Sequence, residues 1–438
     1  MAIEKQPSCE DDEEPALLPV DVALQRLASM VLPLSQTETE TVGIREALDR
    51  VLSSDVLSPI DVPSYTNSAM DGYALNSRDL PAAGEVTLAV LGTAWAGRPL
   101  EVTVARGEAV RIMTGGMMPP GTDTVVIQEH VQALYDTANE NLQGNSEVTH
   151  IIADGTTAPG RNVRQAGEDI KAGEKVIATG TQLTPAHIGL LASLGVDQVQ
   201  VYRCLKVAFF STGDELRALE THAGQALGPG ELFDSNRHTL FAMLKRLGVT
   251  LIDIGVVADT KEATRQAFID ASSQADVVIS SGGVSAGQAD FVSATLAELG
   301  KVTFWKLAMR PGRPLAYGKV GDAHFFGLPG NPVAVMVTFY EFVQPSIKRL
   351  MGCTETAPAQ FTARCESRLK KSPGRIEYQR GIVSAAADGE VTVRVTGKQG
   401  AGRLTSMAMA NCLIVIPAEN AGVEPGDPVT VHPFHGLM

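Results

Sequence analysis

The chain has few cysteines, and it contains no long apolar run. The five cysteines among 438 residues (Cys9, Cys204, Cys353, Cys365 and Cys412) are scattered and include no C-x-x-C pair. Neither a disulfide framework nor a thiolate zinc site is therefore indicated. No stretch of about 18 apolar residues occurs, and the N-terminal MAIEKQPSCEDDEEP lacks the apolar core of a secretory signal. We expect a cytoplasmic protein in which residues 1–16 form a mobile acidic leader.

Basic residues are also in deficit. The chain has 36 Lys and Arg residues against 50 Asp and Glu residues, a formal net charge of −14. This balance argues against broad binding of nucleic acid or of an anionic membrane, so we expect neither as a partner. An anionic ligand would need a local basic site. The 44% of hydrophobic residues is typical of a globular chain, and the length favours about three domains at roughly 150 residues each.

The N-terminal half gives mixed patterns. Asp21 precedes apolar residues at helical spacing, which predicts a helix that Asp21 caps, and residues 44–52 suggest a second helix. Pro59 and Pro63 then interrupt regular structure. Residues 84–152 form short β-branched runs divided by Gly and Pro, which predicts a small β-rich domain with an exposed hairpin tip at YDTANENLQGNSE.

From Lys206 onward, strands alternate with helices. The strands VAFF, TLIDIGVV and ADVVIS are separated by a helix opened by Asp234 or Ser235 and by a helix that starts at Asp259-Thr260. HFFGLPGNPVAV then predicts a strand, a tight turn and a helix with Asn331 as its cap. This alternation favours a mostly parallel sheet covered by helices.

Beyond Pro358 the pattern is again β. Asp388-Gly389 lies between two alternating runs and predicts a hairpin, and CLIVIPA and DPVTVHPF add strands. We therefore predict a multidomain α/β plus β fold. Its parts are the leader 1–16, an elongated α+β domain formed by 17–58 with 153–205, a β-rich domain 59–152 inserted into it, a three-layer α/β domain 206–352, and a β-barrel-like domain 358–438.

Carboxylates follow the predicted parallel strands. Ligands of open α/β sheets bind outside the carboxyl ends of the strands, and the loops there contain Asp214, Glu215, Asp259 and Asp290. Converging carboxylates repel one another unless a cation or a basic partner is present, and hard oxygen ligands suit Mg²⁺. A plain helix cap is an equal alternative for Asp259, and a solvated loop carboxylate is the alternative for Glu215 and Asp290.

Two glycine-containing turns could present backbone N–H groups to a phosphate. They are SSGGVSAG and LPGNP. Neither is a Walker loop, and each alone is more often a simple tight turn.

Basic residues gather in TFWKLAMRPGRPLAYGK, which supplies Lys306, Arg310, Arg313 and Lys319. If TFWKLAMR is one strand, its period of two places Lys306 and Arg310 on one face. Basic side chains beside backbone donors favour an oxyanion; the alternative is a solvated edge strand. Outside this region, Asp71 in NSAMDGYAL and Thr114 in RIMTGGMMPPGTD lie in loops that alone indicate no more than structural turns.

Eight motifs follow one another along the chain: PSYTNSAMDGYAL (63–75), RIMTGGMMPPGTD (111–123), NVRQAGEDI (162–170), STGDEL (211–216), SSGGVSAGQADF (280–291), FWKLAMRPGRPLAYGK (304–319), FGLPGNPVAV (326–335) and QRG (379–381). Together they resemble the molybdopterin molybdenumtransferase family, the bacterial MoeA-type enzymes related to the E domain of gephyrin. One such motif is weak, whereas eight in family order are highly specific.

The resemblance implies a homodimer of four-domain subunits, with Asp71 and Thr114 reaching the crevice of the other subunit. It implies insertion of molybdate into adenylylated molybdopterin, with Mg²⁺ or another divalent cation, and release of AMP and molybdenum cofactor. A transient contact with the molybdopterin adenylyltransferase follows from the preceding step of the pathway.

By motif position, the resemblance implies functional roles for particular residues. The catalytic set is Asp71, Thr114, Asp169, Glu215, Asp259, Asp290, Lys306 and Arg310, in which Glu215, Asp259 and Asp290 hold the metal. The substrate-binding set is Gly282, Gly283, Ser285, Arg313, Pro329, Gly330, Asn331, Pro332 and Arg380.

The chain departs from the family pattern at three positions. Arg310 and Arg313 stand where relatives often carry Lys, and Ala401 stands where a Ser that helps to bind molybdate is expected. An Arg side chain is a planar fork rather than a point charge, so the oxyanion geometry differs. Two other functions stay open: a non-catalytic, gephyrin-like scaffold or molybdopterin-binding protein, and an adenylyltransferase. The flanking domains argue against the latter, because that enzyme resembles only residues 206–350.

Overall fold

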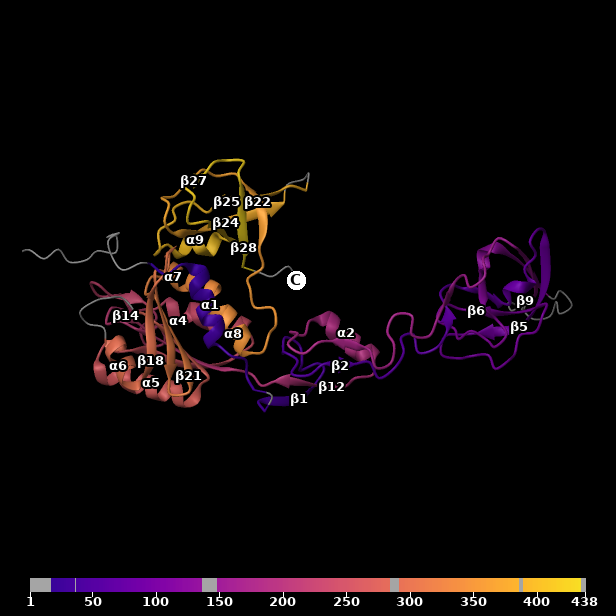
Figure 1. Cartoon of the computed structure of the whole chain (residues 1–438), viewed down its shortest axis with the longest axis horizontal. Coiled ribbons are helices and arrows are strands. Elements are labelled where there is room, and N and C mark those ends of the chain that lie inside the picture. The colour runs from indigo at the N-terminus through magenta and orange to yellow at the C-terminus, as the bar shows by residue number, and fades with distance from the viewer. Residues whose placement is uncertain (1–16, 36, 136–147, 284–290, 386–388, 435–438) are drawn as a thin grey trace, which may run out of the picture. The chain divides into compact units, whose positions relative to one another are not determined.

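The computed structural model describes residues 17–35, 37–135, 148–283, 291–385 and 389–434. The chain divides into two compact units. The first comprises the residues up to Ser53, Gly180–Thr184 and Gln200 onward, and the second comprises Ser54–Thr179 and Pro185–Val199 (Figure 1). The predicted five-part division is finer than this and stays a prediction, and the predicted leader lies outside the described residues. Within the described ranges, no helix is long and apolar enough to cross a membrane.

A six-stranded sheet forms the centre of the first unit. Its order is β16-β13-β17-β21-β20-β18, in which β13, β16, β17 and β21 run parallel and β20 and β18 are antiparallel to their neighbours. The mostly parallel sheet is therefore confirmed. The strands are β13 (Lys206–Thr212), β16 (Thr250–Val257), β17 (Val277–Ser281), β18 (Gly300–Lys306), β20 (Pro314–Val320) and β21 (Ala323–Leu328).

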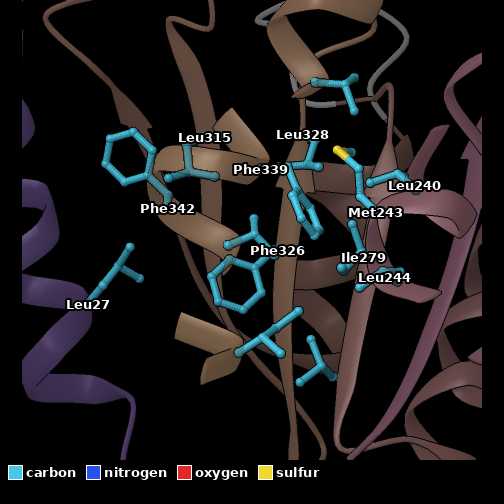
Figure 2. Close-up of a cluster of buried hydrophobic side chains, with 14 of the residues drawn as sticks. Leu27, Leu240, Met243, Leu244, Ile279, Leu315, Phe326, Leu328, Phe339 and Phe342 are labelled. Carbon is cyan, nitrogen blue, oxygen red and sulfur yellow. The ribbon is translucent and has the colours of Figure 1, made fainter. Parts of the chain in front are cut away.

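Helices cover both faces of this sheet, because buried side chains alternate along its strands. Phe209, Ile279 and Phe326 pack on one face with α1, α4 and the helical segments that follow β21. Figure 2 shows Ile279 and Phe326 in this cluster, together with Leu27 of α1 and Leu240 of α4. On the other face, the ring of Phe268 in α5 makes edge contacts with Phe210 and Phe325, with 5.3 Å between ring centroids. The helical segments are α1 (Val20–Met30), α3 (Leu219–His222), α4 (Asn236–Arg246), α5 (Lys261–Gln274), α6 (Phe291–Leu299), α7 (Pro332–Thr338), a π-helical turn (Phe339–Val343) and α8 (Gln344–Leu350). Two short strands, β14 (Leu216–Arg217) and β15 (Leu232–Phe233), pair with each other in parallel.

Two predicted N-terminal helices need correction. The first begins at Val20 behind Pro19, so Asp21 lies in its first turn and does not cap it. Residues 44–49 form turns rather than a second helix, and Asp49 adopts a φ of 63°. Val51 and Leu52 then form β-bridges with Gln182 and Val201. Backbone pairing with distant segments outweighs the local helical pattern here.

The predicted single strand through residues 303–310 is also wrong. β18 ends at Lys306, and Arg310 belongs to β19 (Met309–Arg310), which pairs with β24 in a different sheet. Between them, the Leu307 N–H donates to the Arg313 carbonyl at 2.7 Å and the Ala308 N–H donates to Leu18 at 2.8 Å. These bonds take the chain out of the first sheet, so Lys306 and Arg310 do not share a strand face.

A closed five-stranded barrel forms the C-terminal part of the first unit. The order is β24-β25-β22-β28-β26, and β26 pairs back to β24, which confirms the barrel-like prediction. The elements are β22 (Phe361–Cys365), β23 (Leu369–Lys370), β24 (Ile376–Ala385), β25 (Val391–Val395), α9 (Leu404–Met409), β26 (Cys412–Ile416), β27 (Gly422–Val423) and β28 (Pro428–Pro433). β24 and β25 form the predicted hairpin, although Asp388 lies outside the described residues.

The second unit holds a six-stranded sheet of order β7-β4-β6-β5-β9-β8, which confirms a β-rich domain. Antiparallel pairs lead to and from it: Val56 faces Ile177, Val62 faces Ile170 and Ser68 faces Val163. The predicted hairpin tip lies outside the described residues, whereas the flanking strands β8 and β9 pair antiparallel. The elements of the second unit are β2 (Val56–Leu57), β3 (Asn67–Ser68), β4 (Gly72–Leu75), β5 (Glu85–Ala94), β6 (Glu108–Ile112), β7 (Thr124–Ile127), β8 (Val131–Tyr135), β9 (Val148–Asp154), β10 (Val163–Arg164), β11 (Lys175–Ile177), α2 (Pro185–Ser193) and two short 3₁₀ turns (Ser77–Asp79 and Gln128–His130). A separate two-stranded sheet is formed by β1 (Thr39–Gly43) and β12 (Gln198–Tyr202).

Candidate functional site

Four loops leave the carboxyl edge of the parallel strands. Their strands, β16, β13, β17 and β21, are direct neighbours in the sheet and run in the same direction. The loops therefore start side by side, as the alternation of strands and helices predicted. They begin at Gly213, Ala258, Gly282 and Pro329.

A hydrogen bond joins the first two loops. Asp214 Oδ1 accepts a hydrogen bond from the backbone N–H of Asp259 at 3.3 Å. Thr260, not Asp259, caps α5, because its Oγ1 accepts from Ala263 N–H at 3.2 Å. The capping alternative for Asp259 is therefore wrong. Glu215 is exposed, and its carboxylate packs against Gly213, where an added Cβ would lie 2.6 Å from it.

These carboxylates suit a hard divalent cation in their chemistry. The described ranges do not include Asp290. Within them, there is no group of three His, Cys, Asp or Glu side chains placed to hold a metal. Mg²⁺ is commonly bound by one or two carboxylates, with phosphate and water oxygens completing its shell. Glu215 and Asp259 are oxygen donors of that class on adjoining loops, so the donor set fits such an ion.

The third loop requires its glycines. Gly282 and Gly283 have φ angles of 92° and 68°, and a Cβ on Gly282 would lie 2.6 Å from the carbonyl oxygen of Thr212. The Gly282 N–H donates to the Leu328 carbonyl at 3.1 Å, which ties this loop to the end of β21. Ser285 lies outside the described residues.

The fourth loop, Pro329–Gly330–Asn331, leads into α7. Asn331 is at the N-cap position and Pro332 is the first helical residue, as predicted, although the Asn331 side chain makes no capping bond. Gly330 and Asn331 are exposed. The Val333 N–H donates to the carbonyl oxygen of Ala401 at 3.0 Å. One N–H at the start of this helix is thus already used by the barrel.

A basic cavity of about 480 Å³ lies where β19 pairs with the barrel. Arg310 is 70% exposed and its nearest carboxylate oxygen, in Glu377, is 3.6 Å away. The cationic lining residues are Arg310, Arg368, Lys370 and Arg380. Sequence reasoning missed Arg368 and Lys370, since Arg368 directly precedes the short strand β23 and Lys370 lies in it, with no motif around them.

Arg380 is buried in the wall of this cavity, at 1% exposure. Its guanidinium donates to the carbonyls of Gln399 and Gly400 at 3.0 and 3.1 Å and to Ser406 Oγ at 3.3 Å. Burial lowers the pKa of Arg380 to about 10, so the side chain stays charged at neutral pH. Carbonyl oxygens solvate this charge without neutralising it.

Lys306 and Arg313 lie near the end of β18. Both are partly buried, and the Leu307 N–H donates to the backbone carbonyl of Arg313. They are absent from the lining of the basic cavity. The predicted basic cluster is therefore split between the end of β18 and the β19 strand.

Asp71 and Thr114 meet in the second unit. Asp71 Oδ1 accepts from both the N–H and the Oγ1 of Thr114, at 2.7 and 2.8 Å. The bond from the backbone N–H, followed by that from the hydroxyl, holds the pKa of Asp71 below its usual range. Both side chains are exposed. Asp169 is also exposed, and its N–H donates to the carbonyl of Val62 at 3.0 Å.

Comparisons with known proteins agree along the whole chain. Residues 18–195 match the MoeA N-terminal region (domain I and II), 208–349 match a probable molybdopterin binding domain, and 362–434 match the MoeA C-terminal region (domain IV). A molybdopterin molybdenumtransferase of Haemophilus influenzae is 43% identical over 92% of this chain and 95% of its own, and one of Nostoc is 37% identical over 91% and 89%.

A more distant relative and a solved structure extend this similarity. A gephyrin of Dictyostelium discoideum is 30% identical, over 94% of this chain and 62% of its own. The crystal structure of a molybdopterin biosynthesis MoeA protein of Pyrococcus horikoshii superposes with a TM-score of 0.80 at 27% identity, covering 96% of this chain and all of that one. The chain belongs to the molybdopterin molybdenumtransferase, or MoeA, family.

Proposed function

We propose that this chain is a molybdopterin molybdenumtransferase that inserts molybdate into adenylylated molybdopterin and releases AMP. The observation that supports this most is the pairing of two chemically opposite regions in one unit. Acidic loops follow the parallel strands, and a basic cavity opens beside β19. A nucleotide-activated, phosphate-bearing pterin and a doubly charged oxyanion together need both regions.

The acidic loops would serve the pyrophosphate end of the pterin substrate. Glu215 and Asp259, with Asp290, would hold Mg²⁺ or another divalent cation, whose charge would stabilise the leaving phosphate. The backbone N–H groups of Gly283 and Gly330 would face its phosphate oxygens, since the N–H of Gly282 is already bonded to the Leu328 carbonyl. A Cβ on Gly282 would lie 2.6 Å from the Thr212 carbonyl oxygen and one on Gly283 would lie 2.4 Å from the Val292 side chain, so this loop keeps its path only with glycine.

The basic cavity would take molybdate. Arg310 presents an exposed guanidinium, and Arg380 adds a buried charge that no carboxylate neutralises among its hydrogen bonds. Charge-assisted hydrogen bonds are the strong ones for an oxyanion. Lys306 and Arg313, near the end of β18, would line the path between this cavity and the acidic loops.

We further propose a homodimer in which Asp71, Thr114 and Asp169 complete the site of the partner subunit, together with a transient contact to the adenylyltransferase that supplies the substrate. Asp71, Thr114 and Asp169 belong to the second unit, whereas all the loops at the carboxyl edge belong to the first. A scaffold that had lost its chemistry would have no need to keep these residues.

Release of AMP tests this function. The purified chain is given adenylylated molybdopterin, with molybdate and Mg²⁺ each present or omitted, and AMP is measured by chromatography. We expect AMP only when both are present, and loss of the reaction after chelation with recovery on adding Mg²⁺. AMP release that does not depend on molybdate would contradict the proposal. So would the absence of AMP release when molybdate and Mg²⁺ are both present.

A further inference from the structure

Asn236 joins the two glycine-containing loops of the crevice. It is the first residue of α4 and is 7% exposed. Its Nδ2 donates to Ser281 Oγ at 2.8 Å and to the carbonyl oxygen of Gly330 at 2.7 Å. Because a carbonyl oxygen can only accept, the atom that faces Gly330 must be the amide nitrogen, which fixes the orientation of the side chain.

The two acceptor groups lie at and just beyond the ends of two neighbouring strands. Ser281 is the last residue of β17, directly before Gly282, and Gly330 lies in the turn between β21 and α7. The Ser281 hydroxyl is also 3.5 Å from the carbonyl oxygen of Pro329, the limit of a hydrogen bond. A single amide group therefore sets the separation of the turns that follow two neighbouring strands.

The residues around Asn236 keep it in place. Asp234 is 1% exposed, and its Oδ1 accepts from Ser211 Oγ and from the Arg237 N–H, both at 3.2 Å. Ser211 stands in register with Ser281 on the adjacent strand β13. Arg237 is in turn bonded to Asp253 at 2.7 Å. The start of α4 is thus fixed to the sheet independently of the loops, so Asn236 can act as a rigid reference for them.

The nitrogen and the oxygen of the Asn236 amide differ in their hydrogen bonding. Its Oδ1 is buried, and no residue in the described part of the chain forms a hydrogen bond with it. A buried acceptor without a partner costs about 1–3 kcal/mol. Ala at this position would avoid that cost but would lose the bonds to Ser281 and Gly330, so what the amide contributes lies in its two bonds to the loops.

We propose that Asn236 is a positioning residue that holds the turns at Gly282 and Gly330 at the separation at which their backbone groups bind adenylylated molybdopterin. The inference rests on the proposed function and adds a residue that acts through these turns without touching the substrate. It also separates the two substrates, because Asn236 is absent from the lining of the basic cavity.

Four variants of the full chain test it. Asn236→Ala removes both hydrogen bonds, Asn236→Asp keeps the volume but sets an acceptor against the Gly330 carbonyl, and Ser281→Ala removes one bond. Ser346→Ala is the control, because it makes the same change at a buried serine of α8, whose hydroxyl donates to the carbonyl of Phe342 at 2.7 Å. AMP release is measured against each substrate in turn.

For the two Asn236 variants we expect the half-saturating concentration of adenylylated molybdopterin to rise at least about tenfold, the equivalent of one lost hydrogen bond. The half-saturating molybdate concentration should stay within about twofold of wild type. Ser281→Ala should give part of the increase and should add little to Asn236→Ala in the double variant, because the two groups share one interaction. Equal increases for both substrates, or an Asn236→Asp curve that matches wild type, would overturn the proposal.

Amide hydrogen exchange provides a measurement that does not depend on activity. In the ligand-free chain, Asn236→Ala should speed exchange at residues 281–283 and 330–331, whereas Ser346→Ala should not. If wild type releases no AMP, the proposed function fails while the exchange result still decides the positioning role. Unchanged exchange in both segments would refute it, whatever the activity.

Discussion

Two cations of the C-terminal region are buried in the same way, and one of them, Arg380, lines the basic cavity. Arg380 and Lys371 are 1% and 8% exposed, and each bonds to backbone carbonyls: Lys371 Nζ reaches Asn420 at 2.9 Å and Ala418 at 3.0 Å. Carbonyl dipoles reduce the cost of burial without cancelling the charge. Against a formal net charge of −14, such local positive charge is what allows an oxyanion to approach.

Arg310 is the residue whose loss should weaken molybdate most directly. A charge-assisted hydrogen bond contributes about 1.5–3 kcal/mol, so Arg310→Ala should raise the half-saturating molybdate concentration about ten- to a hundredfold. Arg310→Lys should recover part of this, because the charge returns without the planar fork, and Ala401→Ser should tighten molybdate modestly.

Arg394→Ala is the control for this series, since Arg394 is exposed on β25 and is absent from the cavity lining. The measurement is AMP release against molybdate concentration. If the Arg310→Ala curve superimposes on that of wild type, Arg310 is a solvated charge that does not bind molybdate.

Glu215 should affect cation binding rather than the stability of the fold. Since its side chain is exposed, Glu215→Gln should leave the thermal midpoint within about 2 °C of wild type. It should raise the Mg²⁺ concentration needed for half-maximal AMP release at least about tenfold, because one anionic ligand becomes neutral. Glu366→Gln, an exposed carboxylate in the barrel, is the matched control. An unchanged Mg²⁺ titration in Glu215→Gln would remove Glu215 from the metal site.

His324 predicts how the stability of the α/β part depends on pH. Burial, with a smaller effect of Lys319, lowers the pKa of His324 to about 4, while Asp276 opposes this. The folded chain therefore keeps the imidazole neutral, hydrogen-bonded to the Tyr317 hydroxyl at 2.9 Å. Its stabilising contribution is complete above the unfolded pKa near 6.5 and is lost as the pH falls toward 4, by about 1–2 kcal/mol at pH 5.

The two tryptophans make this measurable. In a Trp95→Phe background, Trp305 reports on this edge of the sheet, since its ring lies 6.1 Å from that of Tyr317. Denaturant unfolding followed by Trp305 fluorescence should show a steeper loss between pH 7 and pH 5 with His324 than with His324→Gln. The exposed His150→Gln serves as control, and equal slopes in all three chains would contradict this account.

At the scale of elements, periodicity predicted what is local and failed where the chain changes sheet. The parallel strands, the helices opened near Ser235 and Thr260, and the barrel hairpin were predictable, because apolar period and turn residues specify them within a few residues. The strand-like pattern through residues 303–310 gives no sign of the switch between sheets, which depends on bonds from Leu307 and Ala308 to other segments.

The candidate site was predictable to a similar degree. The crevice and its carboxylates follow from strand order, as Asp214 and Asp259 show. The contact of Asp71 with Thr114 spans 43 residues, and no local pattern carries it. Asn236 looked like part of a helix start, because its partners lie 45 and 94 residues away.

Gly318 tests how closely the antiparallel strands pack. It lies in β20 between Val302 of β18 and Phe325 of β21, and a Cβ there would lie 2.1 Å from the carbonyl oxygen of Lys301. Because backbone cannot rotate away, Gly318→Ala should destabilise this edge by about 2–3 kcal/mol. Gly321→Ala, in the turn at φ 59° with nothing within 4 Å, should cost only about 1 kcal/mol. Trp305 fluorescence during unfolding compares the two, and equal losses would show that the close contact is relieved.

At the scale of the whole molecule, the proposed shared site makes activity a property of two chains. A chain with Asp71→Ala is mixed with one carrying Glu215→Ala under conditions in which subunits exchange. Half of the dimers become mixed, and each then holds one intact site and one doubly altered site. About a quarter of wild-type activity should return.

The matched control mixes Asp71→Ala with Thr114→Ala. Both changes fall in the second unit, so every site in the mixed dimer keeps one defect and no activity should return. Mass measurement by light scattering checks the dimer itself. Recovery in both mixtures, or in neither, would contradict a site built from two subunits in this way.

The paired segments between residues 56 and 177 also bear on the history of the chain. Every pairing that leads outward, from Val56 with Ile177 to Ser68 with Val163, has the antiparallel order of one long hairpin. Two residues suffice to close a hairpin, so residues 69–162 stand where a short turn could stand. A single genetic insertion or deletion at that point would add or remove the whole β-rich cassette, while every strand of the parallel sheet and of the barrel kept its place.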